Sequence, residues 1–292
     1  MNKDKVAVII INYQTSHLMH NLINSIDEDK VAHSIFIVDN ASTNESYNEL
    51  ISLQSGSVEI LKSEKNLGFT GGINFALRHI IESKEKFQYF FLLNPDAFSC
   101  KNLISDLVHI LKLNKEVAAV SPKISYLNGN PWYSGAQINY KKGQVINNSI
   151  SKLGTSDNLY AVDVFSGCAV LFDFSKVLEA GMFSEDLFMY FDEAELSIRL
   201  KKQGHKILYS PSHEIIHDVS YTTRNISHLK TYYMTRNKFI VFNHSMSLYN
   251  KIYFMLYEFA FHINNKRLKN AFYHLKGFYD FKKGKKGPYL AQ

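Results

Sequence analysis

The stretch LFMYFDEAELSIRL, residues 187–200, places three carboxylates directly after a run of large apolar side chains. These acids are Asp192, Glu193 and Glu195. An acid in the first turn of a helix is stabilised by the helix dipole by about 0.3–1 kcal/mol, so a helix start alone accounts for carboxylates here. An apolar approach also excludes water and strengthens the interaction of a carboxylate with a substrate hydroxyl. The stretch is therefore either an ordinary helix start or a helix that presents an acid to a substrate.

Further polar residues with possible chemistry follow four apolar runs: Asn12-Tyr13, Asp39-Asn40, residues 66–68 and residues 94–96. Asp39 can accept N–H bonds from a pyrimidine base, with Tyr13 placed to stack on it. The stretch NLGFTGGIN puts small residues at a helix start, where backbone N–H groups face a negative charge. Its spacing fits neither a dinucleotide fingerprint nor a P-loop. Asp96, in NPD, offers one carboxylate to a divalent cation, and Mg²⁺ prefers one or two carboxylates plus substrate phosphates.

The elements that must position these residues alternate between strand and helix patterns. VAVIIIN, SIFIVD, VEILK and YFFLLN are typical of buried strands, and the helices between them carry apolar residues every third or fourth position. Such alternation predicts an α/β fold with a mostly parallel central sheet and helices on both faces. The carboxyl ends of parallel strands share one edge, where ligands bind. Turn chemistry alone explains any one of the four polar clusters, but it explains all four together less well.

Composition narrows the classes of protein. Apolar residues make up 46% and charged residues 21% of 292 residues, which is typical of a globular protein. Two cysteines without metal-type spacing favour a reduced, cytoplasmic protein, and no run has the ~20 apolar residues of a membrane span. Residues 263–292 contain eight Lys or Arg and one acid. This basic, aromatic end suits an anionic surface, either a bilayer or a nucleic acid. The aromatic segment, residues 249–263, fits either a helix that packs on the catalytic domain or an interfacial helix on the inner face of the cell membrane.

Seven ordered segments together resemble glycosyltransferase family 2, in its rhamnosyltransferase-like bacterial branch. They are VAVIIINYQT, IVDNAST, NLGFTGGIN, FFLLNPDA, SGCAVLF, GMFSEDLFMYFDEAELSIRLKKQG and IIHDVSYTT. The resemblance runs over about three quarters of the chain. It implies a fold of the glycosyltransferase A type in residues 1–223, followed by an aromatic, basic helical region in residues 224–292. It also implies inverting transfer from a nucleotide-diphosphate sugar, dTDP- or UDP-linked, to a glycan or lipid-linked acceptor.

The resemblance assigns roles to residues of this chain. The donor would be bound by Asn12, Tyr13, Asp39, Asn66, Gly68, Gly72 and Asn94. Mg²⁺ or Mn²⁺ would be held by Asp96 and His217, with Asn94 standing where the family often has a first aspartate. Asp192 and Glu193 would form the catalytic acid pair, with Glu193 as the base.

Two other interpretations stay open on the sequence alone. A nucleotidyltransferase also uses a parallel sheet and a metal, but it has no need of Glu193 and the chain has no basic, Gly-rich phosphate loop near its start. A sugar- or nucleic-acid-binding module with a basic arm would bind without turnover. We expect a transferase and no nucleic-acid partner, with rhamnose as one candidate sugar.

Overall fold

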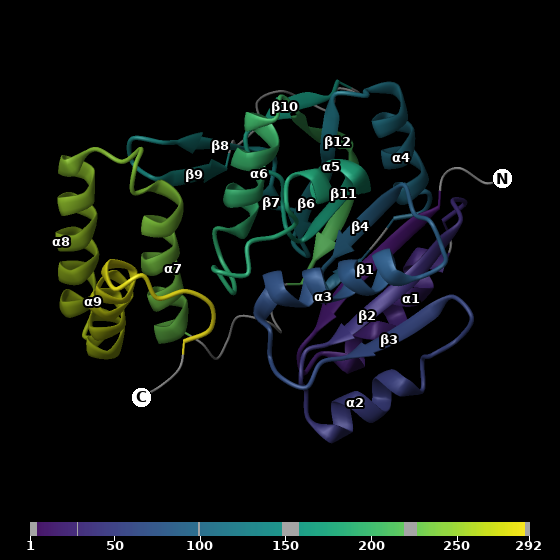
Figure 1. The fold of residues 1–292 in the computed structure, drawn as a ribbon, viewed down its shortest axis with the longest axis horizontal. Helices are drawn as coiled ribbons and strands as arrows, with labels where there is room; N and C mark the ends of the chain where they lie inside the picture. Colours follow the sequence, from purple (N-terminus) through teal and green to yellow (C-terminus); the bar gives the residue numbers. More distant parts are fainter. Residues whose placement is uncertain (1–4, 28, 99, 148–157, 219–226, 290–292) are drawn as a thin grey trace.

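The computed structural model describes residues 5–27, 29–98, 100–147, 158–218 and 227–289. The strands are β1 (Val6–Asn12), β2 (His33–Asp39), β3 (Val58–Lys62), β4 (Tyr89–Leu93), β5 (Ala97–Phe98), β6 (Val117–Tyr126), β7 (Pro131–Tyr133), β8 (Ala136–Asn139), β9 (Gln144–Asn147), β10 (Tyr160–Val162), β11 (Ala169–Asp173) and β12 (Lys206–His217). The helices are η1 (Ser16–Leu18), α1 (Met19–Asp27), α2 (Asn44–Ile51), α3 (Gly68–Glu82), α4 (Leu103–Leu113), α5 (Phe174–Glu179), α6 (Asp192–Lys202), α7 (Ser227–Phe242), α8 (Leu248–Asn264) and α9 (Leu268–Lys282). Figure 1 shows α7, α8 and α9 grouped at the left, beside the sheet and the other helices that surround it.

The main sheet has its path in the order β10-β12-β6-β11-β4-β1-β2-β3. The pairs β1–β2, β1–β4, β2–β3 and β6–β12 are parallel, which confirms the predicted α/β fold. The strand β11 lies antiparallel to both β4 and β6, so the sheet is mixed. Every residue of β1 and β4 is buried, because these central strands are covered on both faces.

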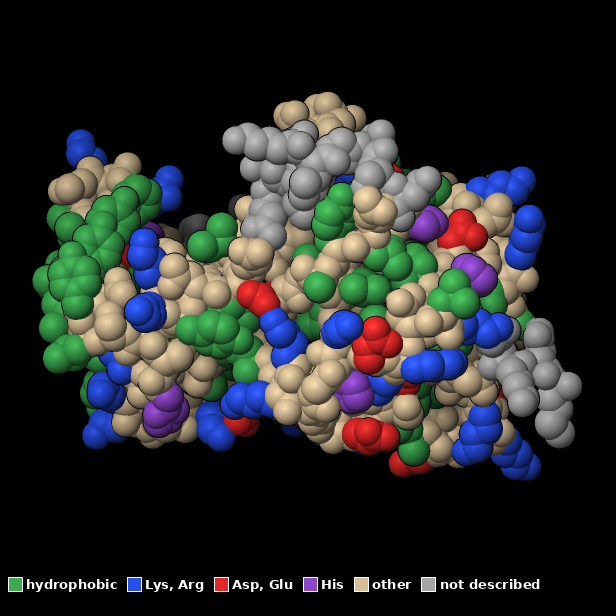
Figure 2. All heavy atoms as spheres, turned by 90° about the horizontal axis from the view of Figure 1, so that it is seen from above, with side chains coloured by type: hydrophobic (Ala, Val, Ile, Leu, Met, Phe, Trp, Pro, Cys, Tyr) green, Lys and Arg blue, Asp and Glu red, His purple; other side chains and the backbone are tan. Residues whose placement is uncertain are grey.

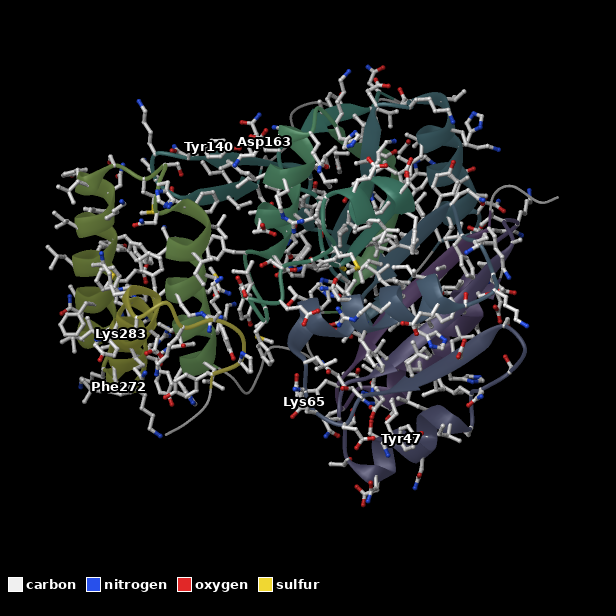
Figure 3. All side chains as sticks on the ribbon, viewed as in Figure 1. Tyr47, Lys65, Tyr140, Asp163, Phe272 and Lys283 are labelled. Carbon is white, nitrogen blue, oxygen red and sulfur yellow. The ribbon has the colours of Figure 1, made fainter. Side chains whose placement is uncertain are left out.

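The loosely patterned stretch after β6 forms β7 at the sheet and then the separate β8–β9 hairpin. The tip of this hairpin reaches the C-terminal helices, where the ring of Tyr140 lies edge-on to Phe242 of α7 at 6.4 Å between centroids (Figure 3). The hairpin thus bridges the sheet and the helical region. In the part of the chain that the structure describes, no helix combines the length and apolar character needed to cross a bilayer.

Candidate active site

A connected set of polar side chains lies at the carboxyl ends of β1 and β2. In the parallel register Asn12 stands beside Asp39. The Asn12 amide donates to Asp39 Oδ1 at 3.1 Å and to Ser42 Oγ at 3.1 Å. The Asp39 side chain is fully buried, whereas Tyr13 is 48% exposed. Asn12 therefore orients Asp39, and Tyr13 presents an open ring at this edge of the sheet.

Asn40 organises the loop that enters α3. Its amide nitrogen donates to the carbonyl of Gly68 at 3.0 Å and to Asn66 Oδ1 at 3.3 Å, and its oxygen accepts from the N–H of Leu67 at 2.8 Å. Asn66 Oδ1 in turn accepts from the Gly68 N–H at 2.8 Å. Asn66 is thus part of the loop's own bonding. Asn40 belongs to a predicted polar cluster, but its role as the centre of this loop was missed because the partners come from a distant segment.

The start of α3 has a different partner from the expected one. The N–H groups of Phe69 and Thr70 donate to the carbonyl of Phe188 at 2.8 and 3.3 Å, so these two donors do not face an anion. Gly72 is buried against β1, and a Cβ built on it would lie 3.1 Å from Ile11 Cγ2. The structure therefore places Gly72 in the helix–strand contact.

The two predicted metal ligands meet, although they are 121 residues apart. The strand β5 pairs with β12 so that Ala97 faces His217. This pairing puts Asp96 Oδ1 3.0 Å from His217 Nε2, with both side chains at most 3% exposed. The ring of Trp132 packs edge-on against His217 at 4.8 Å between centroids. Asn94, at the start of the same turn, is half-buried.

Asp96 Oδ1 and His217 Nε2 are at hydrogen-bond distance, 3.0 Å, and both are atoms of the kind that bind a divalent cation. Two ligands at right angles in an octahedral shell, each at about 2.1 Å from the metal, lie about 3.0 Å apart. The described residues hold no cluster of three or more His, Cys, Asp or Glu that would enclose a metal. The remaining positions of such a cation would fall to substrate oxygens and water, as Mg²⁺ commonly has them.

The acid pair begins α6. Asp192 is 2% exposed, and its Oδ2 has no hydrogen-bond partner among the described residues. Burial, followed by the charge of Glu193, raises the pKa of Asp192 well above its ordinary range. Burial also raises the pKa of Glu193, but the N–H of Gly167 and a hydrogen bond from Asp192 oppose that rise. Burial thus disfavours the charged form of both acids, and the neighbouring charge of Glu193 adds to this effect at Asp192.

Residues 166–168 connect the acid pair to the predicted metal ligands. The Gly167 N–H bonds to Glu193, and a Cβ on Gly167 would lie 2.8 Å from Glu193 Oε1. One residue later, the carbonyl of Cys168 accepts from the Asn94 N–H at 2.8 Å. Burial, and secondarily the charge of Asp96, raises the pKa of the Cys168 thiol. Glu193 and Asn94, two residues before Asp96, thus contact adjacent residues of the same short segment.

The loop before α6 has an unusual backbone. Phe188, Tyr190 and Phe191 all have φ near +66°, a region that bulky residues rarely adopt and that costs of order 1–3 kcal/mol per residue. The Asn237 amide nitrogen of α7 lies 2.9, 2.7 and 3.0 Å from the carbonyl oxygens of residues 187, 189 and 190. The Phe188 carbonyl is bound from the other side by α3. Contacts on both sides therefore hold the loop in this conformation.

Arg236 of α7 also binds the loop before α6. It is fully buried, and its Nη2 donates to the carbonyls of residues 186 and 187 at 3.2 and 3.1 Å. Its Nη1 donates to the carbonyl of Gly287 at 2.7 Å, while the rings of Tyr232 and Tyr233 face its guanidinium. The C-terminal helices are thus bound directly to the loop that positions Glu193. Short-range sequence patterns give no sign of this contact.

A cavity of about 700 Å³ opens beside Glu193. Its walls come from α6, the β8–β9 hairpin and α7, α8 and α9, and they include Trp132, Tyr190 and Phe254. Asp39 and Asp96 do not line it. Glu193 lies on the wall of this cavity, and so does Trp132, whose ring packs against His217.

A family model described as glycosyl transferase family 2 matches residues 7–179. The chain belongs to glycosyltransferase family 2. This glycosyltransferase is 26% identical over 246 residues to the low-salt glycan biosynthesis hexosyltransferase Agl10 of Haloferax volcanii, covering 82% of this chain and 76% of that relative. The rhamnosyltransferase-like branch is not identified by either match.

Solved structures share the fold of this glycosyltransferase, which is of the glycosyltransferase A type. The mannosyltransferase PcManGT of Pyrobaculum calidifontis, in complex with GDP-Man and Mn²⁺, has a TM-score of 0.59 at 14% identity and covers 98% of this chain and 76% of its own. GalNAc-T7, with UDP, GalNAc and Mn²⁺, has a TM-score of 0.60 at 16% sequence identity, and the match covers 81% of this chain but only 51% of GalNAc-T7. TarS 1-349 of S. aureus has a TM-score of 0.55 at 12% identity, and the match covers 96% of this chain and 92% of TarS 1-349.

Proposed function

We propose that this glycosyltransferase moves a sugar from a nucleotide-diphosphate donor to a hydroxyl of a glycan or lipid-linked acceptor, with inversion at the anomeric carbon. The observation that carries the proposal is that Glu193 contacts Gly167, while Asn94, two residues before Asp96, binds the next residue, Cys168. An in-line displacement needs a base on the acceptor side and a charge-neutralising group on the leaving side. We assign Glu193 to the acceptor side and Asp96 to the leaving side.

Each residue has a defined part in this reaction. Glu193 accepts the proton of the acceptor hydroxyl as its oxygen bonds to the anomeric carbon. The bond from that carbon to the phosphate oxygen breaks, and the nucleoside diphosphate leaves with the electron pair. Asp192 keeps its own proton and hydrogen-bonds Glu193. The exposed ring of Tyr13 offers the nucleobase a stacking surface, and Asp39 shapes the edge beside it.

Asp96 and His217 would hold a divalent cation, Mg²⁺ or Mn²⁺, which when bound neutralises charge on the departing diphosphate. The separation of 3.0 Å between their ligand atoms supports this assignment. The presence of Mn²⁺ with the donor or nucleotide in two structurally similar proteins adds to it.

A panel of nucleotide-sugar donors tests the proposed function. In a thermal-shift assay the protein is mixed with dTDP-rhamnose, UDP-hexoses or GDP-mannose, each with Mg²⁺ or Mn²⁺. We expect one class of donor to raise the melting temperature, because a ligand that binds only the native state stabilises it. The selected donor is then expected to turn over, by transfer or slow hydrolysis. Release of pyrophosphate in place of a nucleoside diphosphate would indicate a nucleotidyltransferase. Binding without any turnover would indicate a binding module.

A glycine-to-alanine change tests the placement of Glu193. The methyl group of Gly167→Ala would fall 2.8 Å from Glu193 Oε1 and displace the carboxylate. We expect turnover to fall about 10–100-fold with donor affinity little changed, because small misplacements of a reacting group cost that much. The matched control is Gly56→Ala, where a Cβ meets nothing within 4 Å. Equal turnover in the two variants would remove Glu193 from the reaction.

We also propose that the enzyme is cytoplasmic and rests on the anionic inner face of the membrane through α8 and α9. Large exposed apolar side chains gather there, and Figure 2 shows this apolar face at the left end of the molecule with Lys and Arg around it. Exposed on α8 and α9 are Leu248, Tyr249, Ile252, Tyr253, Leu256, Tyr257, Phe259, Phe261, Ile263, Leu268, Phe272, Leu275 and Tyr279. An apolar face bordered by cations suits an interfacial helix.

The membrane proposal is tested by vesicle sedimentation. Leu256 is 66% exposed and Ile252 52% exposed, so replacing both with serine removes apolar area without opening the core. Binding to anionic phospholipid vesicles is expected to weaken about tenfold or more. The control is Leu113→Ser, which removes a side chain that is 69% exposed on α4. A double variant that sediments like the control would contradict the proposal. The deletion of residues 282–292 is a poorer test, because Gly287 binds Arg236 and Asp186.

A further inference from the structure

The cavity beside Glu193 contains a buried cation. Lys238 of α7 is only 5% exposed, yet it lines the cavity wall. Its ammonium lies 4.0 Å from the centroid of the Phe254 ring, and among the described residues it has no ion pair and no hydrogen bond. Burial lowers the pKa of Lys238 to about 8, and the charge of Glu258 on the same cavity wall opposes that shift without a hydrogen bond or ion pair between the two. Burying a charged group without a hydrogen-bonded partner is costly, so this lysine points to a ligand that completes it.

Two more cations face the same space. Lys230 of α7 and Arg267, just before α9, both line the cavity and are exposed. Neither has a carboxylate partner within the described part of the chain. Apart from Glu193, the acid on the wall is Glu258, whose carboxylate lies 3.9 Å from His262 Nε2. Cations thus outnumber acids on the wall away from Glu193.

We propose that this cavity is the acceptor subsite and that Lys238, Lys230 and Arg267 bind a phosphate or diphosphate group of the acceptor. The inference rests on the proposed transfer function, because it assigns the second substrate to the cavity next to the base. The cavity volume of about 700 Å³ is enough for a sugar and a diphosphate. Arginine and lysine are the side chains that bind phosphate oxygens, and the cluster's excess of positive charge matches a diphosphate.

The remaining walls fit the rest of such an acceptor. Trp132, Tyr190 and Phe254 give apolar and aromatic surface, and Glu193 lies on the same cavity. A sugar phosphate held by the three cations therefore has its hydroxyls within the space that Glu193 borders. The phosphate has two possible sources: a lipid-linked sugar diphosphate or a water-soluble phosphorylated glycan.

Trp132 makes a direct binding experiment possible, because it is the only tryptophan of the chain and lines the cavity. The full-length protein is titrated with geranyl diphosphate and with inorganic pyrophosphate in EDTA, which removes divalent cations from the donor side. We expect a saturable change in Trp132 fluorescence. Tighter binding of geranyl diphosphate would assign the phosphate to a lipid-linked acceptor, and equal binding would assign it to a water-soluble one.

Variants locate the binding. Lys238→Met and the exposed Arg267→Met are each expected to weaken binding about tenfold or more, because each removes a charge-assisted contact. Lys283→Met is the control, since Lys283 lies in the helical region outside the cavity lining (Figure 3). Unchanged affinity in both Lys238→Met and Arg267→Met would overturn the subsite.

Donor hydrolysis by the unmodified enzyme separates this inference from the proposed function, because hydrolysis needs water and Glu193 but no acceptor. Turnover of the donor without saturable binding of either phosphate probe would reject the subsite and leave the transferase standing. Phosphate binding in a protein that turns over no nucleotide sugar would leave the subsite standing and reject the transferase.

Discussion

Glu193→Gln is expected to lose transfer by about 10²–10⁴-fold while donor affinity stays within about twofold. The amide keeps the size and most of the contacts of the side chain, but it cannot accept the acceptor's proton. Because Glu193 lies on the wall of the cavity and binds the Gly167 N–H, the substitution leaves the backbone of the site in place. The measurement pairs single-turnover transfer with calorimetric titration of the donor. Near-normal transfer would remove the base assignment.

Asp192→Asn is the matched control for this variant. If Asp192 carries its own proton, the amide of asparagine donates the same hydrogen bond to Glu193, and transfer is expected to stay within about tenfold of normal. A loss as large as that of Glu193→Gln would instead make Asp192 the base. The comparison decides which carboxylate of the pair acts, a question that the order of the two acids in the sequence leaves open.

The pH dependence follows from the direction of the pKa shifts. Burial raises the pKa of Glu193, so the acid side of the rate profile is expected above the ordinary range of a glutamate near 4.3. Asp192 has a raised pKa in the folded state, so its contribution to the free energy of unfolding is largest at low pH and falls as pH rises above about 3.9 toward the folded value. Asp192→Asn lacks this loss. Its melting temperature relative to the unmodified enzyme is therefore expected to increase from pH 5 to pH 8.

Asp96→Ala is the second change with a large expected effect. It removes the proposed carboxylate ligand and leaves His217 Nε2 without its partner at 3.0 Å. We expect donor affinity in Mn²⁺ to fall about 100-fold and the difference between Mn²⁺ and EDTA to disappear, because ligand loss typically costs at least as much as the 10–100-fold of an outer-shell change. Calorimetric titration of the donor with and without Mn²⁺ measures both quantities.

The control for Asp96→Ala is Asp106→Ala, which removes a carboxylate that is 55% exposed on α4. That variant is expected to keep the Mn²⁺ dependence. If Asp96→Ala binds the donor in Mn²⁺ as tightly as the control does, the cation is held elsewhere. In that case His217→Ala is also expected to leave the donor affinity in Mn²⁺ unchanged, because both residues would lie outside the metal site.

The sequence predicted the strand ends well because they depend on short-range patterns. Buried strands are continuous apolar runs, and polar residues must follow where each strand leaves the core, as at Asn12 and Asp39. The pair of Glu195 and Arg199, four residues apart on α6, is of the same kind, with 2.6 Å between Arg199 Nη2 and Glu195 Oε2. Such features need only the spacing of neighbours in one element.

Other features depend on contacts that no local pattern carries. The hydrogen bonds from Arg236 and Asn237 to residues 186–190 join segments about 50 residues apart, and they hold three bulky residues at positive φ. The raised pKa of Asp192 arises from burial by tertiary packing, whereas a helix start alone favours its ionised form. The start of α3 is a further example, because the N–H groups of Phe69 and Thr70, expected to face an anion, donate to the carbonyl of the distant Phe188.

The most direct measurement is a crystal structure of the Glu193→Gln enzyme with its nucleotide-sugar donor and Mn²⁺. We expect a manganese ion bonded to Asp96, His217 and the diphosphate. We also expect the substituted side chain at position 193 to face the anomeric carbon from the side opposite the phosphate. A manganese ion bound away from Asp96, or an anomeric carbon turned away from position 193, would contradict these expectations.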